Sequence, residues 1–222
     1  MSVVTRLAEA CAAQRVLELG AGTGSNSRYF LEVHPCLFIG LDLSAKMLAQ
    51  ACAKPINAHW TQACATQLPL RSRSMDFVFG CYVLHHVQRL DDVFHECARV
   101  LDHGGVAFVT SPPDFIRRHP MNQYFPSFAR VDGARFRSFE EIASNLKRAG
   151  FDDIGSERVY AEPVPIDQSY AEKVANKFIS TYDLIPPEEF EQGLRRLRAD
   201  LDTHGRLDTD MVWESLVVWG FR

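Results

Sequence analysis

The feature that most constrains this chain is a set of three glycines that follows a short apolar segment. Residues 16–25 read VLELGAGTGS, which places Gly20, Gly22 and Gly24 at alternate positions. Glycine is favoured where the backbone needs a positive φ angle or where a ligand approaches the backbone closely. The pattern therefore predicts a buried strand that ends in a tight ligand-binding turn and leads into a helix.

The spacing of these glycines disfavours a nicotinamide cofactor. The dinucleotide fingerprint is G-x-G-x-x-G. Counted from Gly20, its third glycine falls on Ser25, and counted from Gly22 it falls on Ser27. A nicotinamide-dependent oxidoreductase therefore remains only as the least favoured of the functions considered.

Two acidic residues accompany the glycine turn. Asp42 ends the next predicted strand, where a carboxylate can accept hydrogen bonds from both hydroxyls of a ribose. Glu18 lies within the first strand, where a buried carboxylate is costly unless it is hydrogen-bonded or paired. Asp42 could also be an ordinary cap or turn residue, and Glu18 a satisfied core residue. Together with the turn, however, they favour a nucleoside ligand.

Strands and helices alternate through the first half of the chain. We expect strands at residues 16–19, 37–41, 58–62, 77–80 and 106–111, and helices at residues 3–13, 25–33, 44–53 and 90–101. Such alternation predicts a parallel sheet covered by helices on both faces.

The second half is less regular. We expect an irregular segment at 112–137, a helix at 138–149, extended chain at 151–164, helices at 168–181 and 187–201, and a closing strand at 214–220. Long irregular segments in compact domains are usually functional or disordered.

Composition narrows the range of functions. The formal net charge of -4 argues against a nucleic-acid partner, because such partners select basic surfaces. Six cysteines occur without a C-x-x-C pair or zinc-site spacing, so we expect no metal. No apolar run is long enough to span a bilayer and no basic, then apolar, leader is visible. We therefore expect a cytoplasmic protein with no membrane partner.

Four segments, matching in order and spacing, are similar to the class I S-adenosylmethionine-dependent methyltransferases, in particular the methyltransferase type 11 group. They are VLELGAGTG (16–24), GLDLS (40–44), ATQLPLRSRSMDFVFGCYVLHHV (65–87) and ARVLDHGGVAFVTS (98–111). The resemblance implies a Rossmann-like, doubly wound, mostly parallel seven-stranded α/β sheet with helices on both faces. It also implies one domain over residues 1–222, with substrate-side inserts near 112–137 and 165–205, that methylates a small-molecule acceptor.

The resemblance also implies a set of cofactor contacts for S-adenosylmethionine. The glycine turn and Glu18 would hold the methionine part, Asp42 the ribose, and the residues after the second, third and fourth strands the remaining groups. The full set is Glu18, Gly20, Gly22, Gly24, Asp42, Leu43, Met47, Cys64, Ala65 and Cys81.

One position departs from the family pattern. Relatives commonly carry an Asp after the third strand that accepts a hydrogen bond from the adenine amino group, whereas this chain reads Ala63-Cys64-Ala65. A thiol is a poorer acceptor than a carboxylate. We therefore expect weaker recognition of the adenine amino group.

The segment after the fourth strand supplies the predicted catalytic and acceptor-binding residues. His85 is the predicted catalytic base, because imidazole can take a proton near neutral pH. Tyr82, His86, Asp114 and Phe115 are predicted substrate contacts. Both histidines could instead be purely structural.

An excess of arginine between residues 114 and 137 would suit an anionic, partly apolar acceptor. Solvated arginines on a surface loop are the alternative explanation. The sequence also leaves open a cofactor-binding protein without catalysis, and either a monomer or a homodimer.

Overall fold

The computed structural model describes all residues from 1 to 222. The chain forms two compact units, each built from several stretches of sequence. The first unit comprises Met1–Thr110, Ser138–Arg158 and Leu216–Arg222, and the second comprises Ser111–Arg137 and Val159–Ser215. None of the helices is both long and apolar enough to cross a membrane.

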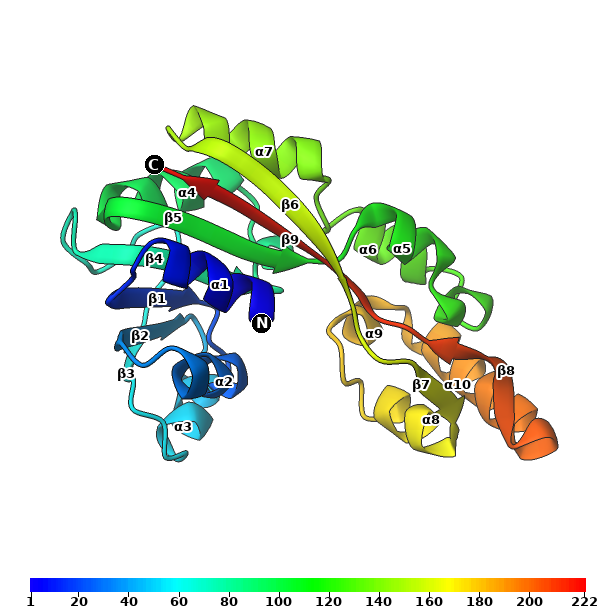
Figure 1. Ribbon diagram of the computed structural model, residues 1–222. Helices are drawn as coiled ribbons and strands as arrows, with labels where there is room; N and C mark the ends of the chain where they lie inside the picture. Colours follow the sequence, from blue (N-terminus) through cyan, green and yellow to red (C-terminus); the bar gives the residue numbers. More distant parts are fainter. The chain divides into compact units, whose positions relative to one another are not determined.

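The first unit is built on a seven-stranded sheet with the order β3-β2-β1-β4-β5-β9-β6 (Figure 1). Strands β1 to β5 pair in parallel, and β9 pairs antiparallel to β5. The bounds are β1 Arg15–Leu19, β2 Leu37–Asp42, β3 His59–Gln62, β4 Met75–Cys81, β5 Leu101–Thr110, β6 Asp152–Tyr160 and β9 Glu214–Phe221. The predicted mostly parallel, doubly wound sheet is confirmed.

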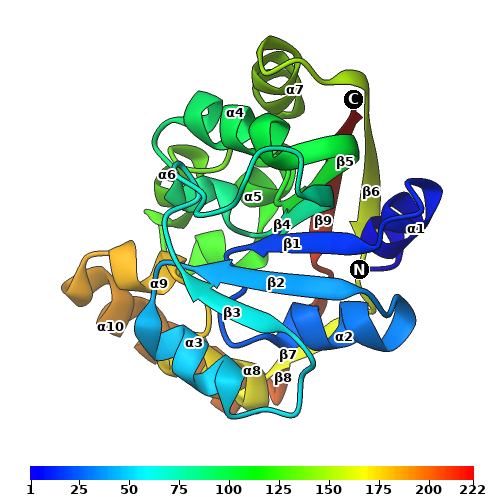
Figure 2. The same cartoon turned by 90° about the vertical axis from the view of Figure 1, so that its left-hand side faces the viewer.

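Helices cover both faces of this sheet. They are α1 Ser2–Ala10, α2 Ser25–Val33, α3 Ala45–Cys52, the 3-10 turn η1 Leu84–His86, α4 Leu90–Val100 and α7 Phe139–Arg148. Figure 2 shows α4 and α7 together at the top of the view and α2 and α3 at the bottom. Successive strand residues point to opposite faces, which lets one strand serve both layers.

The buried side chains of the first unit follow this alternation between the two faces of the sheet. Leu17 and Leu19 of β1 belong to the apolar cluster that includes Phe94 of α4. On α2, Phe30 stacks on Phe79 of β4 with ring centroids 5.0 Å apart. The two faces of the sheet are therefore packed by different helices, as the sequence pattern predicts.

The second unit has its own core, rich in aromatic side chains. Phe125 and Tyr182 meet edge to face, and Phe125 stacks on Phe190. Its elements are α5 Pro113–Arg118, the 3-10 turn η2 Pro120–Gln123, α6 Phe128–Gly133, β7 Val164–Asp167, α8 Gln168–Ala175, α9 Thr181–Leu184, α10 Pro187–His204 and β8 Arg206–Met211. The strands β7 and β8 form a separate antiparallel pair.

Two expectations about the second half were wrong in detail, and one strand was missed. Residues 112–137 are not irregular, because Pro113 and Pro120 each start a helical turn, a position that proline suits. The expected helix at 168–181 is divided into α8 and α9, and Lys177 between them has a φ of 50°. The strand β8, whose sequence RLDTDM is mostly polar, has no apolar pattern that would have revealed it.

The fit of α10 against the core of the second unit gives a first testable prediction. A Cβ added at Gly193 would lie 2.5 Å from the Phe125 ring and 2.6 Å from the Tyr124 carbonyl oxygen. We expect Gly193→Ala to lower the free energy of unfolding by about 1–3 kcal/mol, since overpacking forces neighbours to move. Urea denaturation followed by circular dichroism measures this loss.

The matched control is Gly133→Ala. A Cβ at Gly133 would meet no atom within 4 Å, and this glycine ends a helix. Alanine is the better helix former by up to about 1 kcal/mol, so this variant should be neutral or more stable. Equal effects of the two substitutions would contradict the packing at Gly193.

Candidate functional site

The turn after β1 needs glycine at all three positions. Gly20, Gly22 and Gly24 have φ angles of 68°, 56° and 77°. A Cβ at Gly20 would lie 2.6 Å from a methyl carbon of Val83, and one at Gly24 would lie 2.9 Å from Trp60. A Cβ at Gly22 would meet nothing within 4 Å. The turn is therefore packed against other side chains at Gly20 and Gly24, and its backbone has free space beside it at Gly22.

Asp42 holds this turn from the end of β2. One carboxylate oxygen accepts a hydrogen bond from the Gly22 N–H at 2.8 Å, and the other accepts from the Ser44 N–H, also at 2.8 Å. The Ser44 hydroxyl in turn accepts from the Met47 N–H and caps α3. Each carboxylate oxygen has a second lone pair, so Asp42 can still accept bonds from a ligand.

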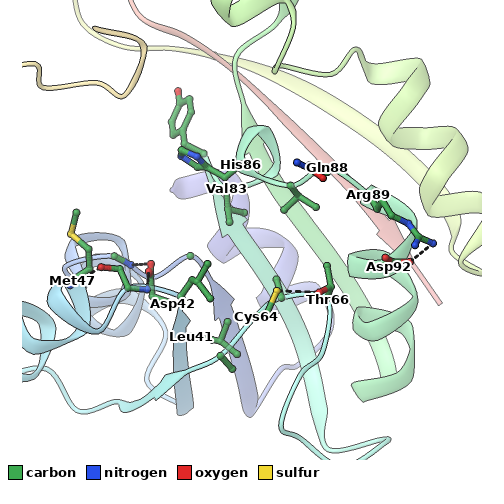
Figure 3. Close-up of a pocket in the computed structure, with 18 residues that line it drawn as sticks. Leu41, Asp42, Met47, Cys64, Thr66, Val83, His86, Gln88, Arg89 and Asp92 are labelled. Carbon is green, nitrogen blue, oxygen red and sulfur yellow. Dashed lines mark hydrogen bonds and ion pairs between the residues drawn. The ribbon is translucent and has the colours of Figure 1, made fainter. Parts of the chain in front are cut away.

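A cavity of about 950 Å³ opens beside the turn and Asp42 (Figure 3). Every residue that lines it belongs to the first unit. In the close-up, Asp42 and Met47 stand on one side, and Gln88, Arg89 and Asp92 stand on the other. A ligand in the cavity would therefore be bounded by the ends of β1 and β2 and by the start of α4.

The structure brings most of the predicted site residues together on this cavity. Its lining includes Gly20, Gly22, Asp42, Leu43, Met47, Cys64, Ala65, Tyr82 and His86. The predicted residues outside the lining are Glu18, Gly24, Cys81 and His85 in the first unit, and Asp114 and Phe115 in the second.

Sequence reasoning missed several lining residues. They are Leu41, Ser44, Ala63, Thr66, Val83, Val87, Gln88, Arg89 and Asp92. Some signal was present, because Thr66 directly follows the predicted contacts Cys64 and Ala65. Gln88 and Arg89 directly follow the YVLHHV segment that supplied Tyr82 and His86.

Two large apolar side chains on the cavity wall are open to solvent. Leu43 is 70% exposed and Met47 is 43% exposed. Exposed apolar surface gathered on a cavity usually marks a ligand site. Leu43 and Met47 come soon after Asp42 in the chain and line the same cavity. A ring attached to a ribose at Asp42 would therefore cover their side chains.

Cys64 lies on the same cavity and is exposed. Its Sγ is 3.0 Å from the Thr66 hydroxyl oxygen (Figure 3). Hydrogen bonds from the hydroxyl and the backbone N–H of Thr66 lower the pKa of the thiol. The Cys64 sulfur is therefore a polar group on a cavity wall that also carries the apolar side chains of Leu43 and Met47.

The opposite wall comes from the chain after β4. Tyr82 has a positive φ of 51°, and its N–H donates to the Val109 carbonyl at 2.8 Å. The ring of His86, on the cavity, lies 4.0 Å from the ring of His85. Arg89 and Asp92 form an ion pair of 3.0 Å at the rim. His86, rather than the predicted His85, is the histidine that a ligand in the cavity would meet.

Glu18 lies in β1, two residues before the glycine turn, and is fully buried. One carboxyl oxygen accepts a short hydrogen bond from the Ser27 hydroxyl of α2, and the other, Oε1, is buried with no hydrogen-bond partner. Burial raises the pKa of Glu18 to about 8, against the lowering effect of Ser27 and with a further increase from the charge of Asp42. The site therefore contains one polar atom that nothing in the protein satisfies.

Comparison with known proteins assigns the family. A sequence family described as a methyltransferase domain matches residues 17–109. A probable S-adenosylmethionine-dependent methyltransferase of Mycolicibacterium smegmatis is 30% identical over 154 residues, covering 68% of this chain and 56% of the relative. The chain belongs to the class I S-adenosylmethionine-dependent methyltransferases.

Two further methyltransferases extend the comparison. A malonyl-acyl-carrier-protein O-methyltransferase of Enterobacter lignolyticus is 39% identical over 101 residues, covering 45% of this chain and 40% of the relative. A solved structure named as a candidate methyltransferase from an antibiotic biosynthesis pathway of Anabaena variabilis has a TM-score of 0.75 at 22% identity. It covers 97% of this chain and 96% of its own, so the methyltransferase fold extends over nearly the whole chain. The chain spans about half the length of the curated relatives that it matches.

The site fits the cofactor of that family, S-adenosylmethionine. The open side of Gly22 leaves room for a ligand against the backbone. The buried Oε1 of Glu18 lacks a donor, and the ligand's ammonium group is a donor. Exposed Leu43 and Met47 offer apolar surface for its base.

The protonation of Glu18 gives a second testable prediction. Because its pKa is raised from 4.5 to about 8, the folded protein keeps a proton that the unfolded chain loses in this range. The free energy of unfolding should therefore fall as pH rises from about 5 to 8, by up to about 1.4 kcal/mol per pH unit from this group. Glu18→Gln removes the titrating carboxyl, so its stability advantage over the wild type should grow with pH in urea denaturation.

Glu96→Gln is the control for that experiment. A hydrogen bond from Arg99 lowers the pKa of Glu96, so its contribution to stability is lost only in acid, as pH falls through the lowered value. The stability difference between Glu96→Gln and the wild type should stay constant between pH 5 and 8. A constant difference for Glu18→Gln as well would show that Glu18 is not protonated in the folded protein.

Proposed function

We propose that this chain transfers a methyl group from S-adenosylmethionine to a small-molecule acceptor. The observation that carries the proposal is the hydrogen bond between the Gly22 N–H and the Asp42 carboxylate at the edge of the cavity. It fixes a ribose acceptor beside a turn that only glycine allows. Within a chain of this family, that pairing supports a working cofactor site.

Each part of the cofactor has a matching group in the first unit. Asp42 would accept hydrogen bonds from the ribose hydroxyls, and Leu43 with Met47 would lie against the adenine. The edge of the base would meet Cys64 and Ala65, which follow the end of β3. The methionine part would lie over the glycine turn, with Glu18 beneath it and Cys81 close by at the end of β4.

When bound, S-adenosylmethionine supplies a methyl group on a positively charged sulfur that a nucleophile can displace. Alignment of the nucleophile with that carbon is therefore the main requirement on the protein. Tyr82 and His86 border the cavity and would orient the acceptor there. His86 could take a proton from the acceptor where its nucleophile carries one.

The predicted anionic character of the acceptor depends on the arginines between residues 114 and 137. Two of these arginines form ion pairs within the protein. Arg118 pairs with Glu214, and Arg135 pairs with the buried Asp132 at 2.6 Å. This pairing reduces the positive charge available for an anionic acceptor. An anionic acceptor, and its contacts with Asp114 and Phe115, therefore stay predictions.

Cys64 supports a second candidate, a cofactor-binding protein without turnover. A thiol in place of the family's usual carboxylate would leave the adenine less firmly held. The two functions differ in whether bound S-adenosylmethionine is converted to S-adenosylhomocysteine when acceptors are supplied. Formation of S-adenosylhomocysteine in step with a methylated product would establish the transferase.

Calorimetric titration with S-adenosylmethionine and, separately, with NAD tests the cofactor site. We expect the wild type to bind the former and not the latter, and Asp42→Ala to bind about 10- to 150-fold more weakly, since it loses hydrogen bonds to a charged group. Asp208→Ala removes an exposed carboxylate outside the cavity, so it is the control and should bind as the wild type does. A preference for NAD, or binding unchanged by Asp42→Ala, would refute the proposed site.

Replacement of Cys64 by Asp should restore the acceptor that the chain lacks. We expect Cys64→Asp to bind S-adenosylmethionine about tenfold or more tightly, because a carboxylate bond to the adenine amino group is worth about 1.5–3 kcal/mol. Cys52→Asp adds the same charge at an exposed cysteine outside the cavity and should leave the affinity unchanged. Equal or weaker binding by Cys64→Asp would show that the adenine edge does not face this position.

A further inference from the structure

The buried carboxyl of Glu18 is a group that the fold alone does not satisfy. It is fully buried near the end of β1, two residues before the first glycine of the turn. Ser27 satisfies one oxygen, and the other has no hydrogen-bond partner. Leaving an ionised carboxylate in this condition is expensive, whereas a protonated carboxyl is tolerated more easily.

The groups around Glu18 offer it no positive charge. Asp42 at the end of β2 repels its ionised form, and the Ser27 hydroxyl on α2 is neutral. Cys81 at the end of β4 is kept as a neutral thiol, because burial and the charge of Glu18 raise the pKa of Cys81 to about 12. The N-terminal ammonium group acts on Cys81 and partly offsets that rise. These surroundings favour the protonated form of Glu18.

We infer that Glu18 releases its proton to solvent when the ammonium group of S-adenosylmethionine binds at the glycine turn, so that cofactor binding is coupled to pH. In this step the O–H bond of the Glu18 carboxyl breaks, the proton passes to the buffer, and the carboxylate pairs with the ammonium group. The inference rests on the proposed cofactor site. It assigns to Glu18 a positioning role that depends on its protonation.

The coupling has a definite sign. With its pKa raised to about 8, Glu18 is protonated in the ligand-free protein below that pH, and the bound state favours the ionised form. Affinity for S-adenosylmethionine should therefore rise by about tenfold between pH 6 and 7. Above pH 8 the gain should stop, because Glu18 is then already ionised and the ligand's own α-amino group, with an ordinary pKa of about 7.7–8.0, loses its charge.

Calorimetry at pH 7.0 in phosphate and in Tris buffer measures the proton directly. The two buffers differ in ionisation enthalpy, so the difference in observed binding enthalpy gives the number of protons released. We expect a net release of about 0.8 proton per S-adenosylmethionine bound, because a carboxyl that titrates near pH 8 releases about 0.9 and the ligand's α-amino group takes up about 0.1. The control ligand is 5′-methylthioadenosine, which keeps the nucleoside and the sulfur but has no ammonium group, and it should release none.

The matched variant is Glu18→Gln, which keeps the shape of the side chain and can still accept the Ser27 bond. It should bind S-adenosylmethionine with no proton release and with an affinity independent of pH between 6 and 7. If this variant fails to fold, the comparison of the two ligands on the wild type still decides the question.

The outcomes separate this inference from the proposed function. Binding of S-adenosylmethionine without proton release, or equal release with 5′-methylthioadenosine, would overturn the role of Glu18 and leave the cofactor site standing. Absence of S-adenosylmethionine binding at every pH between 6 and 8 would instead refute the proposed function itself.

Discussion

The hydrogen bond from the Gly22 N–H to the Asp42 carboxylate is the interaction on which the site depends. It joins the turn after β1 to the end of β2, two strands already paired in parallel with Leu19 opposite Leu41. The same carboxylate accepts from the Ser44 N–H at the start of α3. One side chain therefore fixes the glycine turn and the entry to α3, and both form the cavity wall.

Much of this arrangement could be predicted because its causes are local. Glycines at alternate positions after an apolar strand, and an acid at the end of the next strand, are required by backbone angles and by ligand contact at adjacent positions in the sheet. The alternation of strands and helices likewise follows from short stretches of sequence. For these reasons the pattern of residues alone is enough to bring Gly22 and Asp42 to one site, whereas Met47 was added to it by the family resemblance.

Other features depend on contacts between distant residues and gave no local signal. Which of two adjacent histidines meets the cavity depends on how the turn after β4 is oriented, and the positive φ of Tyr82 contributes to that orientation. The strand β8 exists because β7 pairs with it, although its own sequence is polar. Arg135, one of the arginines in the segment predicted to suit an anionic acceptor, pairs with the buried Asp132 at 2.6 Å.

One feature of the site opposes folding, the fully buried Glu18 carboxyl with an unsatisfied oxygen. Such features persist in proteins mainly where function requires them. The three glycines that follow it adopt positive φ angles without strain, and the backbone at Gly22 is open to a ligand. A ligand that lies on this backbone and presents a cation to Glu18 would compensate the buried carboxyl. The unsatisfied oxygen therefore argues, independently of sequence similarity, that this end of the sheet is built to bind a ligand.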